Sequence, residues 1–201
     1  MSWEKDLEEL KKRAELAKEM GGIERIAKHY ARGRLTVRER IDQLLDKDSF
    51  HETGEITGKV TYDENGEIQE FVPANFVFGR GKVDGREVVV AGDDFTVRGG
   101  AADARIGNKS LYSLKLAEHL RLPLINLVDG SGGGGSVKTL ETMGATYVPG
   151  LPSWQNIVRL LSMVPVVGAC MGSVAGLGSA RVVASHFSIM VKGSAQMFVA
   201  G

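Results

Sequence analysis

The feature that most constrains the fold is a unit in which an apolar strand runs through a glycine-rich turn into a helix. The first copy is LINLVDGSGGGGS, where Gly132 to Gly135 follow the apolar run. The second is VPVVGACMGSVAGLGSA, where Gly172, Gly176 and Gly178 follow it. Alternation of strands and helices in this order is typical of βαβ-like units, so the sequence predicts an α/β fold and argues against a β-sandwich.

The segments before these units have patterns of their own. The first twenty residues carry an apolar stripe at helical spacing, which predicts an amphipathic helical arm that ends at Gly21-Gly22. Thr36 followed by Glu39 makes a capping box and predicts the start of another helix. Between residues 53 and 94 the spacing is that of strands, with turns expected at Asp63–Gly66 and at Asp84-Gly85.

Further helices are expected over about residues 103–120, over a weaker segment near 137–146, and after Ser153. The stretch REVVVAGDDF is apolar enough for a central strand, and FSIMV predicts a further strand. These patterns divide the chain into an N-terminal helical arm, residues 1–50, and a domain of residues 51–201. The chain stops just after an apolar stretch, so we expect this domain to be incomplete at its C-terminus.

Composition excludes several classes of protein. The 25 Lys and Arg residues balance 25 Asp and Glu residues, so a nucleic acid or an anionic membrane is not expected as the main partner. No stretch has the length and apolarity of a membrane span, and the acidic start does not resemble a transit peptide. The single cysteine, Cys170, lies in an apolar run and is expected to be buried. A cytoplasmic protein is the prediction.

The two glycine turns are the strongest candidate for chemistry. A helix N-terminus carries free N–H groups and the positive end of the helix dipole, so it stabilises developing negative charge. Two such turns that face each other would place two backbone donors on one oxygen, which is an oxyanion hole. The run GSGGGGS is also compatible with a flexible linker, and it does not match the P-loop motif.

Side-chain chemistry is sparse. The histidines have no metal-ligand spacing, so no metal is expected. Asp93 and Asp94 are either an acid pair or turn caps at a strand end, and Asp129 is a candidate for orienting the glycine loop. The arginines that precede and enter the second helix are expected to be solvated helix charges more than a phosphate site; these are Arg32, Arg34, Arg38 and Arg40.

Three blocks of sequence together resemble the β subunits of biotin-dependent acyl-CoA carboxylases, of the propionyl-CoA and methylcrotonyl-CoA carboxylase type. The blocks are ARGRLTVRERIDQLLDKDSF, DDFTVRGGAADARIGNKSLYSLKLAEHLRLPLINLVDGSGG and MGSVAGLGSARVVASHFSIMVKGSAQMFVAG. The resemblance covers nearly the whole chain and depends on the order and spacing of the blocks. It implies a crotonase-like (ClpP/crotonase) spiral of ββα units and the N-terminal part of a carboxyltransferase.

The resemblance also implies an activity. Carboxybiotin would supply CO₂ and the base, and the enolate of an acyl-CoA would attack the CO₂ while backbone amides hold its oxygen. Biotin would sit on a separate carrier, acyl-CoA would be the substrate, and the enzyme would be a ligase or transferase. The implied partners are a C-terminal carboxyltransferase domain, a biotin carboxylase or biotin carrier subunit, and further copies in a homo-oligomer. The chain alone would be inactive.

Site residues follow from the resemblance by position. The oxyanion donors would be N–H groups around Gly133 and Gly134 in the first turn, and of Gly176 and Leu177 in the second. Arg98, Gly99 and Gly100 would line the CoA side, with Arg98 near the CoA phosphates.

Two other functions remain open. One is a biotin-dependent acyl-CoA decarboxylase subunit, and the other is a non-catalytic CoA-binding or assembly module. The first glycine turn has four glycines where relatives commonly have two followed by Ala-Arg, and Leu177 stands where glycine is usual. These departures leave the acyl group of the substrate open.

Overall fold

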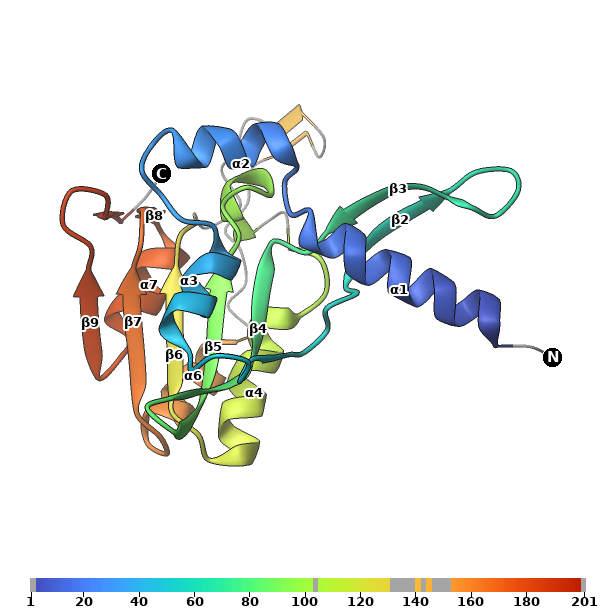
Figure 1. Ribbon diagram of the computed structural model, residues 1–201. Coiled ribbons are helices and arrows are strands. Elements are labelled where there is room, and N and C mark those ends of the chain that lie inside the picture. Colours follow the sequence, from blue (N-terminus) through green and yellow to red (C-terminus); the bar gives the residue numbers. More distant parts are fainter. Residues whose placement is uncertain (1–2, 103–104, 131–139, 142–143, 146–152, 200–201) are drawn as a thin grey trace.

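The computed structural model describes residues 3–102, 105–130, 140–141, 144–145 and 153–199. Its centre is a six-stranded sheet with strand order β1-β4-β5-β6-β7-β9 (Figure 1). From β5 onward the neighbouring strands are parallel, whereas β1, β4 and β5 pair antiparallel. The strands are β1 (His51–Glu52), β4 (Phe76–Val83), β5 (Arg86–Asp93), β6 (Leu124–Val128), β7 (Val166–Cys170) and β9 (Phe187–Met190).

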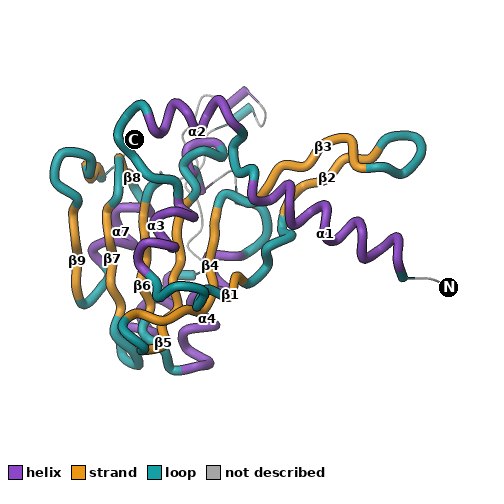
Figure 2. The backbone as a smooth tube through the Cα atoms, in the orientation of Figure 1, coloured by secondary structure: helices purple, strands orange, loops and turns teal. Residues whose placement is uncertain are grey.

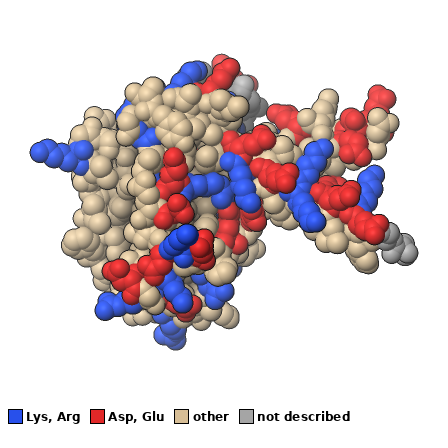
Figure 3. All heavy atoms as spheres, viewed as in Figure 1, with Lys and Arg blue, Asp and Glu red and all other residues tan. Residues whose placement is uncertain are grey.

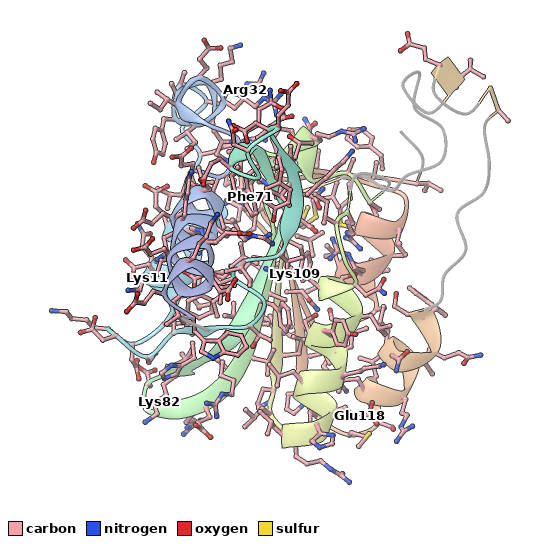
Figure 4. The ribbon with its side chains drawn as sticks, turned by 90° about the vertical axis from the view of Figure 1, so that its right-hand side faces the viewer. Lys11, Arg32, Phe71, Lys82, Lys109 and Glu118 are labelled. Carbon is pink, nitrogen blue, oxygen red and sulfur yellow. The ribbon has the colours of Figure 1, made fainter. Side chains whose placement is uncertain are left out.

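Both faces of the sheet are covered. On one face, α4 (Lys109–Leu120) and α6 (Trp154–Leu161) pack on alternate residues of β4, β5 and β6, such as Phe76, Phe78 and Leu124. Figure 4 shows these two helices side by side, with Glu118 of α4 at the lower end of the pair. On the other face, α3 (Val37–Leu44) packs on the intervening residues. The strands are apolar on both sides for this reason, as buried parallel strands are.

The expected turns are confirmed. Asp84 and Gly85 join β4 to β5 with φ values of 49° and 75°, and positive φ at both positions is typical of a tight hairpin. Asp63 to Gly66 joins β2 (Gly58–Tyr62) to β3 (Ile68–Pro73), which form a separate two-stranded sheet. The Asp63 carboxylate accepts the N–H groups of Asn65 and Glu67 and so stabilises this turn.

The predicted arm is present. Helix α1 (Glu4–Lys18) projects from the sheet beside the β2–β3 hairpin, and α2 (Ile23–Tyr30) lies across one end of the sheet (Figures 1 and 2). Ala17 is buried, whereas Trp3 is 75% exposed, so the apolar stripe of α1 is covered mainly near its C-terminal end. Acidic and basic side chains are mixed along this arm (Figure 3).

Helix α3 begins as the sequence predicts. The Thr36 hydroxyl accepts the N–H of Glu39, and the Glu39 carboxylate accepts the N–H of Thr36. Val37 and Ile41 then pack against the sheet strands in one core. The division at residue 50 remains a prediction, although this helix shares its core with the domain.

The helix expected over residues 103–120 starts later, as α4 at Lys109. Gly107 just before it has a φ of 65°, outside the helical range, so the backbone turns before the helix begins. The helix expected near residues 137–146 lies largely outside the described residues. After β7, the chain forms β8 (Ser173–Ala175), α7 (Leu177–Val183), the edge strand β9 and β10 (Gln196–Phe198), and β10 pairs parallel with β8.

No helix among the described residues has the length and apolarity needed to cross a membrane.

Candidate functional site

The site is built at the edge where the parallel strands end. Asp93 is the last residue of β5, Asp129 follows β6, and Gly172 lies two residues after β7. Since these strands are parallel and adjacent, their carboxyl ends meet at one edge of the sheet. The Asp129 N–H donates to the Asp93 carboxylate at 3.1 Å, which ties the ends of β5 and β6 together.

The second glycine turn places a helix N-terminus at this edge. Gly176 has a φ of 55° and a ψ of −119°, which a residue with a Cβ rarely adopts, and α7 starts at the next residue, Leu177. The N–H of Gly176 donates to the carbonyl oxygen of Phe198 at 3.1 Å, because β10 runs alongside β8. Of the two donors expected here, Leu177 is therefore the one whose N–H, at the first helical position, has no intrahelical acceptor.

The first glycine turn begins against the second. A Cβ on Gly178 would lie 2.5 Å from the carbonyl oxygen of Gly130, so glycine is required where these backbones meet. Gly130 is the last described residue before the first turn. Gly133 and Gly134, the donors expected there, lie outside the described residues.

The segment Arg98–Gly100 closes the edge from the β5 side. It is a short 3₁₀ turn in which all three residues have positive φ, at 50°, 66° and 62°. A Cβ on Gly100 would lie 2.6 Å from the carbonyl oxygen of Asp129. Gly100 therefore packs directly on the start of the first glycine turn, and its role on the CoA side stays a prediction.

Arg98 is exposed and lines a groove of about 220 Å³ between α2 and the turn after β5. The groove carries a concentration of positive charge, and its described lining holds no carboxylate. Its lining residues are Arg25, Lys28, His29, Arg32, Phe95, Thr96, Arg98 and Gly99. Such a groove suits a phosphorylated ligand. Arg98 and Arg32 both line this groove, so positive charge is concentrated here although the net charge of the whole chain is zero. A local phosphate site is compatible with that balance.

The expectation of solvated helix charges is wrong for Arg40 and Arg38. Arg40 is 7% exposed, and its Nη1 lies 2.7 Å from the Asp129 carboxylate. Arg38 makes two hydrogen bonds to Glu52, at 2.6 and 3.3 Å. The helical period places Arg40 beside Ile41 and one turn after Val37, next to the buried face of the helix. That position was the sequence signal from which the burial of Arg40 could have been predicted.

The acid pair is resolved into two different roles. The Asp94 carboxylate accepts the N–H and the hydroxyl of Thr96, so it caps the turn after β5. Burial raises the pKa of Asp94. Asp93 instead accepts from Arg105, at 3.2 Å, and from Arg181. Sequence patterns did not single out these two arginines, because neither stands in a recognisable motif.

The remaining candidates are structural. Cys170 is fully buried, as predicted, and burial raises the pKa of its thiol. Nδ1 of His186 accepts the N–H of Val166 at 3.0 Å. Among the described residues, no group of three His, Cys, Asp or Glu side chains is arranged to hold a metal ion.

The sheet covered on both faces, the helical arm and the glycines at the strand ends belong to a crotonase-like α/β fold, as the resemblance implies. A family model described as the carboxyl transferase domain matches residues 28–201. The chain belongs to the carboxyltransferase domain family. The prediction of a relationship to acyl-CoA carboxylase β subunits is therefore confirmed.

Over the aligned residues, curated relatives are about one third identical to this chain. It is 30% identical to the propionyl-CoA carboxylase carboxyltransferase subunit of Haloferax mediterranei, covering 100% of this chain and 38% of that protein. It is 33% identical to the propionyl-CoA carboxylase beta chain of Roseobacter denitrificans, covering 97% and 37%. It is also 30% identical to the methylmalonyl-CoA decarboxylase subunit alpha of Propionigenium modestum, covering 98% and 37%. The chain thus spans a little over a third of these relatives.

Solved structures agree in fold. The 12S transcarboxylase with methylmalonyl-CoA and methylmalonic acid bound superposes with a TM-score of 0.74 at 26% identity, covering 100% of this chain and 38% of that chain. A single-chain, multi-domain long-chain acyl-CoA carboxylase gives a TM-score of 0.76 at 26% identity, covering 98% and 20%.

Proposed function

We propose that the chain is the N-terminal domain of a carboxyltransferase in a biotin-dependent acyl-CoA carboxylase, which transfers CO₂ from carboxybiotin to the α-carbon of an acyl-CoA. The observation that carries the proposal is the close approach of Gly178, in the first turn of α7, to Gly130, where the first glycine turn begins. If the first glycine turn presents its amides from this junction, one oxygen would lie between backbone donors of the two segments.

The thioester oxygen is the group that these donors would hold. When the α-carbon of an acyl-CoA loses its proton, negative charge develops on this oxygen. The N–H of Leu177 is the proposed donor of the second turn. Gly176 positions it by adopting a backbone conformation that residues other than glycine rarely adopt. The proposed donors of the first turn are the N–H groups of Gly133 and Gly134.

Biotin would supply the activated CO₂ and the base for the α-proton. The cavity beside Leu177 has a volume of about 20 Å³, which is close to the space of one water molecule and too small for a biotin ring. Biotin would therefore not enter this cavity. We assign its binding to a second, C-terminal carboxyltransferase domain, and for this reason the chain alone is expected to be inactive.

The basic groove is the proposed site for the CoA phosphates. Arg98 lies on the turn whose Gly100 packs on Asp129 and Gly130, so the groove adjoins the proposed thioester site. Arg25, Lys28 and Arg32 add positive charge from α2. In this arrangement, CoA would run from α2 over the turn after β5 to the glycine turns.

The organisation of the complete enzyme is part of the same proposal. Residues 1–50 form a helical arm and residues 51–201 a carboxyltransferase domain, working in the cytoplasm with a biotin carboxylase or biotin carrier subunit. A homo-oligomer is expected. The hexamer assembly of the 12S transcarboxylase, a structural relative, supports this expectation.

The donor is tested by Leu177→Pro. Proline at the first helical position fits the helix and removes only an N–H group that has no intrahelical acceptor. With a C-terminal carboxyltransferase domain and a carboxylated biotin carrier added, we expect propionyl-CoA carboxylation to fall about 100- to 1,000-fold. Leu177→Ala, which keeps the N–H group, should retain most of the activity. Full turnover by the proline variant would exclude this donor.

The CoA groove is tested by calorimetry on the 201-residue chain. Arg98→Ala should weaken binding of propionyl-CoA, and it should weaken dephospho-CoA thioesters less if the 3′-phosphate lies in the groove. Lys59→Ala, on exposed strand β2, is the matched control and should not change binding. A chain that binds no CoA thioester would support the assembly-module alternative.

A second candidate is the decarboxylase direction, which the 30% identity to the methylmalonyl-CoA decarboxylase subunit alpha favours. The same backbone donors would hold the enolate formed when CO₂ leaves. With the C-terminal domain, the biotin carrier and a biotin carboxylase present, carboxylation of the carrier by methylmalonyl-CoA without carboxylation of propionyl-CoA from bicarbonate and ATP would assign this direction.

A further inference from the structure

An enclosed cavity lies between the sheet and the helices, beside the proposed thioester site. Its walls come from the face of β4, β6 and β7 that α4 and α6 cover, and from the helices α4, α6 and α7. Leu177 is one of its lining residues. The polar groups of the lining are Arg105, Arg181, Asn126, Ser110, Ser113 and Ser153.

The cavity carries an unbalanced positive charge. Arg105 and Arg181 are buried, with 16% and 11% of their side chains exposed, and both pair with the single carboxylate of Asp93. That carboxylate also accepts the N–H of Asp129, so its two oxygens are already occupied. Among the described residues, no second carboxylate pairs with either arginine.

Each of the two arginines keeps a side-chain N–H donor that has no acceptor in the described part of the chain. The Nε atoms of Arg105 and Arg181 are buried without a hydrogen-bond partner. Burial and the neighbouring Arg181 lower the pKa of Arg105 to about 10, so it stays protonated at neutral pH. Two guanidinium groups that share one carboxylate therefore leave one positive charge for a further anion.

A third polar group points to the same conclusion. Asn126 lies in the apolar strand β6 on the same face as Leu124, and it is only 8% exposed. It lines the cavity, and its side-chain amide makes no hydrogen bond to another described residue. A ligand that accepts its N–H would supply the hydrogen-bond partner that this amide lacks among the described residues.

We propose that Arg105, Arg181 and Asn126 form a site for the carboxylate of a carboxyacyl-CoA. A cavity of about 20 Å³ admits one carboxylate oxygen or a water, and it is too small for a phosphate group. Planar guanidinium groups match the geometry of a carboxylate. The choice of a CoA thioester rests on the proposed function, since Leu177 would hold the thioester oxygen beside the same cavity.

The carboxylate can come from two positions on the acyl group. One is the α-carbon, as in the product of the proposed carboxylation. The other is the far end of a longer dicarboxylic acyl chain. Malonyl-CoA and glutaryl-CoA represent these two sources, and propionyl-CoA and pentanoyl-CoA are their neutral partners of equal carbon number.

The test is calorimetry on the 201-residue chain with these four thioesters. We expect malonyl-CoA, glutaryl-CoA or both to bind at least 10-fold more tightly than the neutral partner. Arg181→Met should abolish that preference while leaving neutral thioesters unaffected. Arg159→Met is the matched control, because Arg159 is an ion-paired surface arginine on α6, and it should keep the preference. Asn126→Leu, which leaves the ion pairs intact, should reduce the preference if Arg181→Met fails to fold.

The outcomes separate this inference from the proposed function. If carboxylated and neutral thioesters bind equally, or if the preference survives both Arg181→Met and Asn126→Leu, the carboxylate site is wrong and the CoA site stands. If no thioester binds, the proposed function fails, and free malonate and glutarate then test the cavity. Weak binding of malonate or glutarate that depends on Arg181 would support a carboxylate site that does not require CoA. If neither free dicarboxylate binds, the inference is overturned.

Discussion

At the scale of single residues, the buried pair of Arg40 and Asp129 joins α3 to the start of the first glycine turn. Asp129 is fully buried and Arg40 is 7% exposed. Taking two charges out of water is costly, so removing one partner leaves an uncompensated buried charge. The pair is therefore a sensitive point for both stability and site geometry.

We predict that Arg40→Met lowers the free energy of unfolding by about 3 to 5 kcal/mol, measured by urea denaturation. Arg159→Met is the control, because Arg159 pairs with Glu118 through a side chain that is 66% exposed. That change should cost under about 1 kcal/mol. Equal losses in the two variants would contradict the assignment of a buried pair.

His29 makes stability depend on pH. Burial lowers the pKa of His29, and although Asp129 acts in the opposite direction, Arg40 and Arg34 reinforce the decrease. The unfolded state then binds a proton more readily than the folded state. The free energy of unfolding should therefore fall as the pH drops from the ordinary histidine pKa of 6.5 to the lower folded value.

His29→Gln keeps a side-chain N–H for the carbonyl oxygen of Leu35, which lies 3.1 Å from Nε2, and removes the titration. Urea denaturation at a series of pH values should give a flatter pH dependence for this variant below about pH 6.5. An unchanged slope would show that His29 is not the titrating group.

At the scale of elements, α7 and the chain that follows β6 meet through a backbone contact at Gly178 and Gly130. A Cβ on Gly178 would lie 2.5 Å from both the Gly130 carbonyl oxygen and Val174 Cγ1. Neither neighbour has room to move, since Val174 is fully buried. The junction between α7 and the end of β6 therefore depends on one missing methyl group.

Gly178→Ala should lower the free energy of unfolding by about 3 kcal/mol through overpacking. Gly66→Ala is the control in the β2–β3 turn, where φ is 78° and the added Cβ meets nothing within 4 Å. This second change should cost about 1 kcal/mol, from the backbone conformation alone. Denaturation curves of similar midpoint for the two variants would contradict the close contact.

The elements differ in how well local sequence predicts them. The capping box at Thr36 and the hairpin at Asp84-Gly85 were predicted correctly, because each depends on residues that are near in sequence. The start of α4 was predicted about six residues early. Gly107, with a φ of 65°, turns the backbone just before the helix, and the Asn75 amide donates to the carbonyl oxygen of Ala101 in the segment that leads to it.

At the scale of the whole molecule, one edge of the sheet is uncovered. Strand β9 is exposed along its length, with Phe187 63% and Ile189 41% exposed. The corresponding side of the molecule in Figure 3 carries few charged groups, whereas charges concentrate over α1 and the β2–β3 hairpin. An apolar edge strand is a template for association with another chain.

We predict that the 201-residue chain self-associates as its concentration rises, as measured by light scattering. Ile189→Lys should reduce this association by placing a charge on the edge. Thr61→Lys, on exposed strand β2 of the hairpin, should not change it. Association that is insensitive to both changes would place the contact elsewhere.

The sequence by itself determined the order of the elements, the glycine turns and the α/β class. These follow from periodicity and from residues close in the chain. Tertiary structure alone decided which polar groups meet: Asp93 with Arg105 and Arg181, Arg40 with Asp129, and the Gly176 amide with Phe198. The partners in these pairs lie up to 89 residues apart in sequence. Local sequence patterns carry no information on pairings at such separations. The physical reason is that burial selects a partner for each charge only after the strands have been placed side by side.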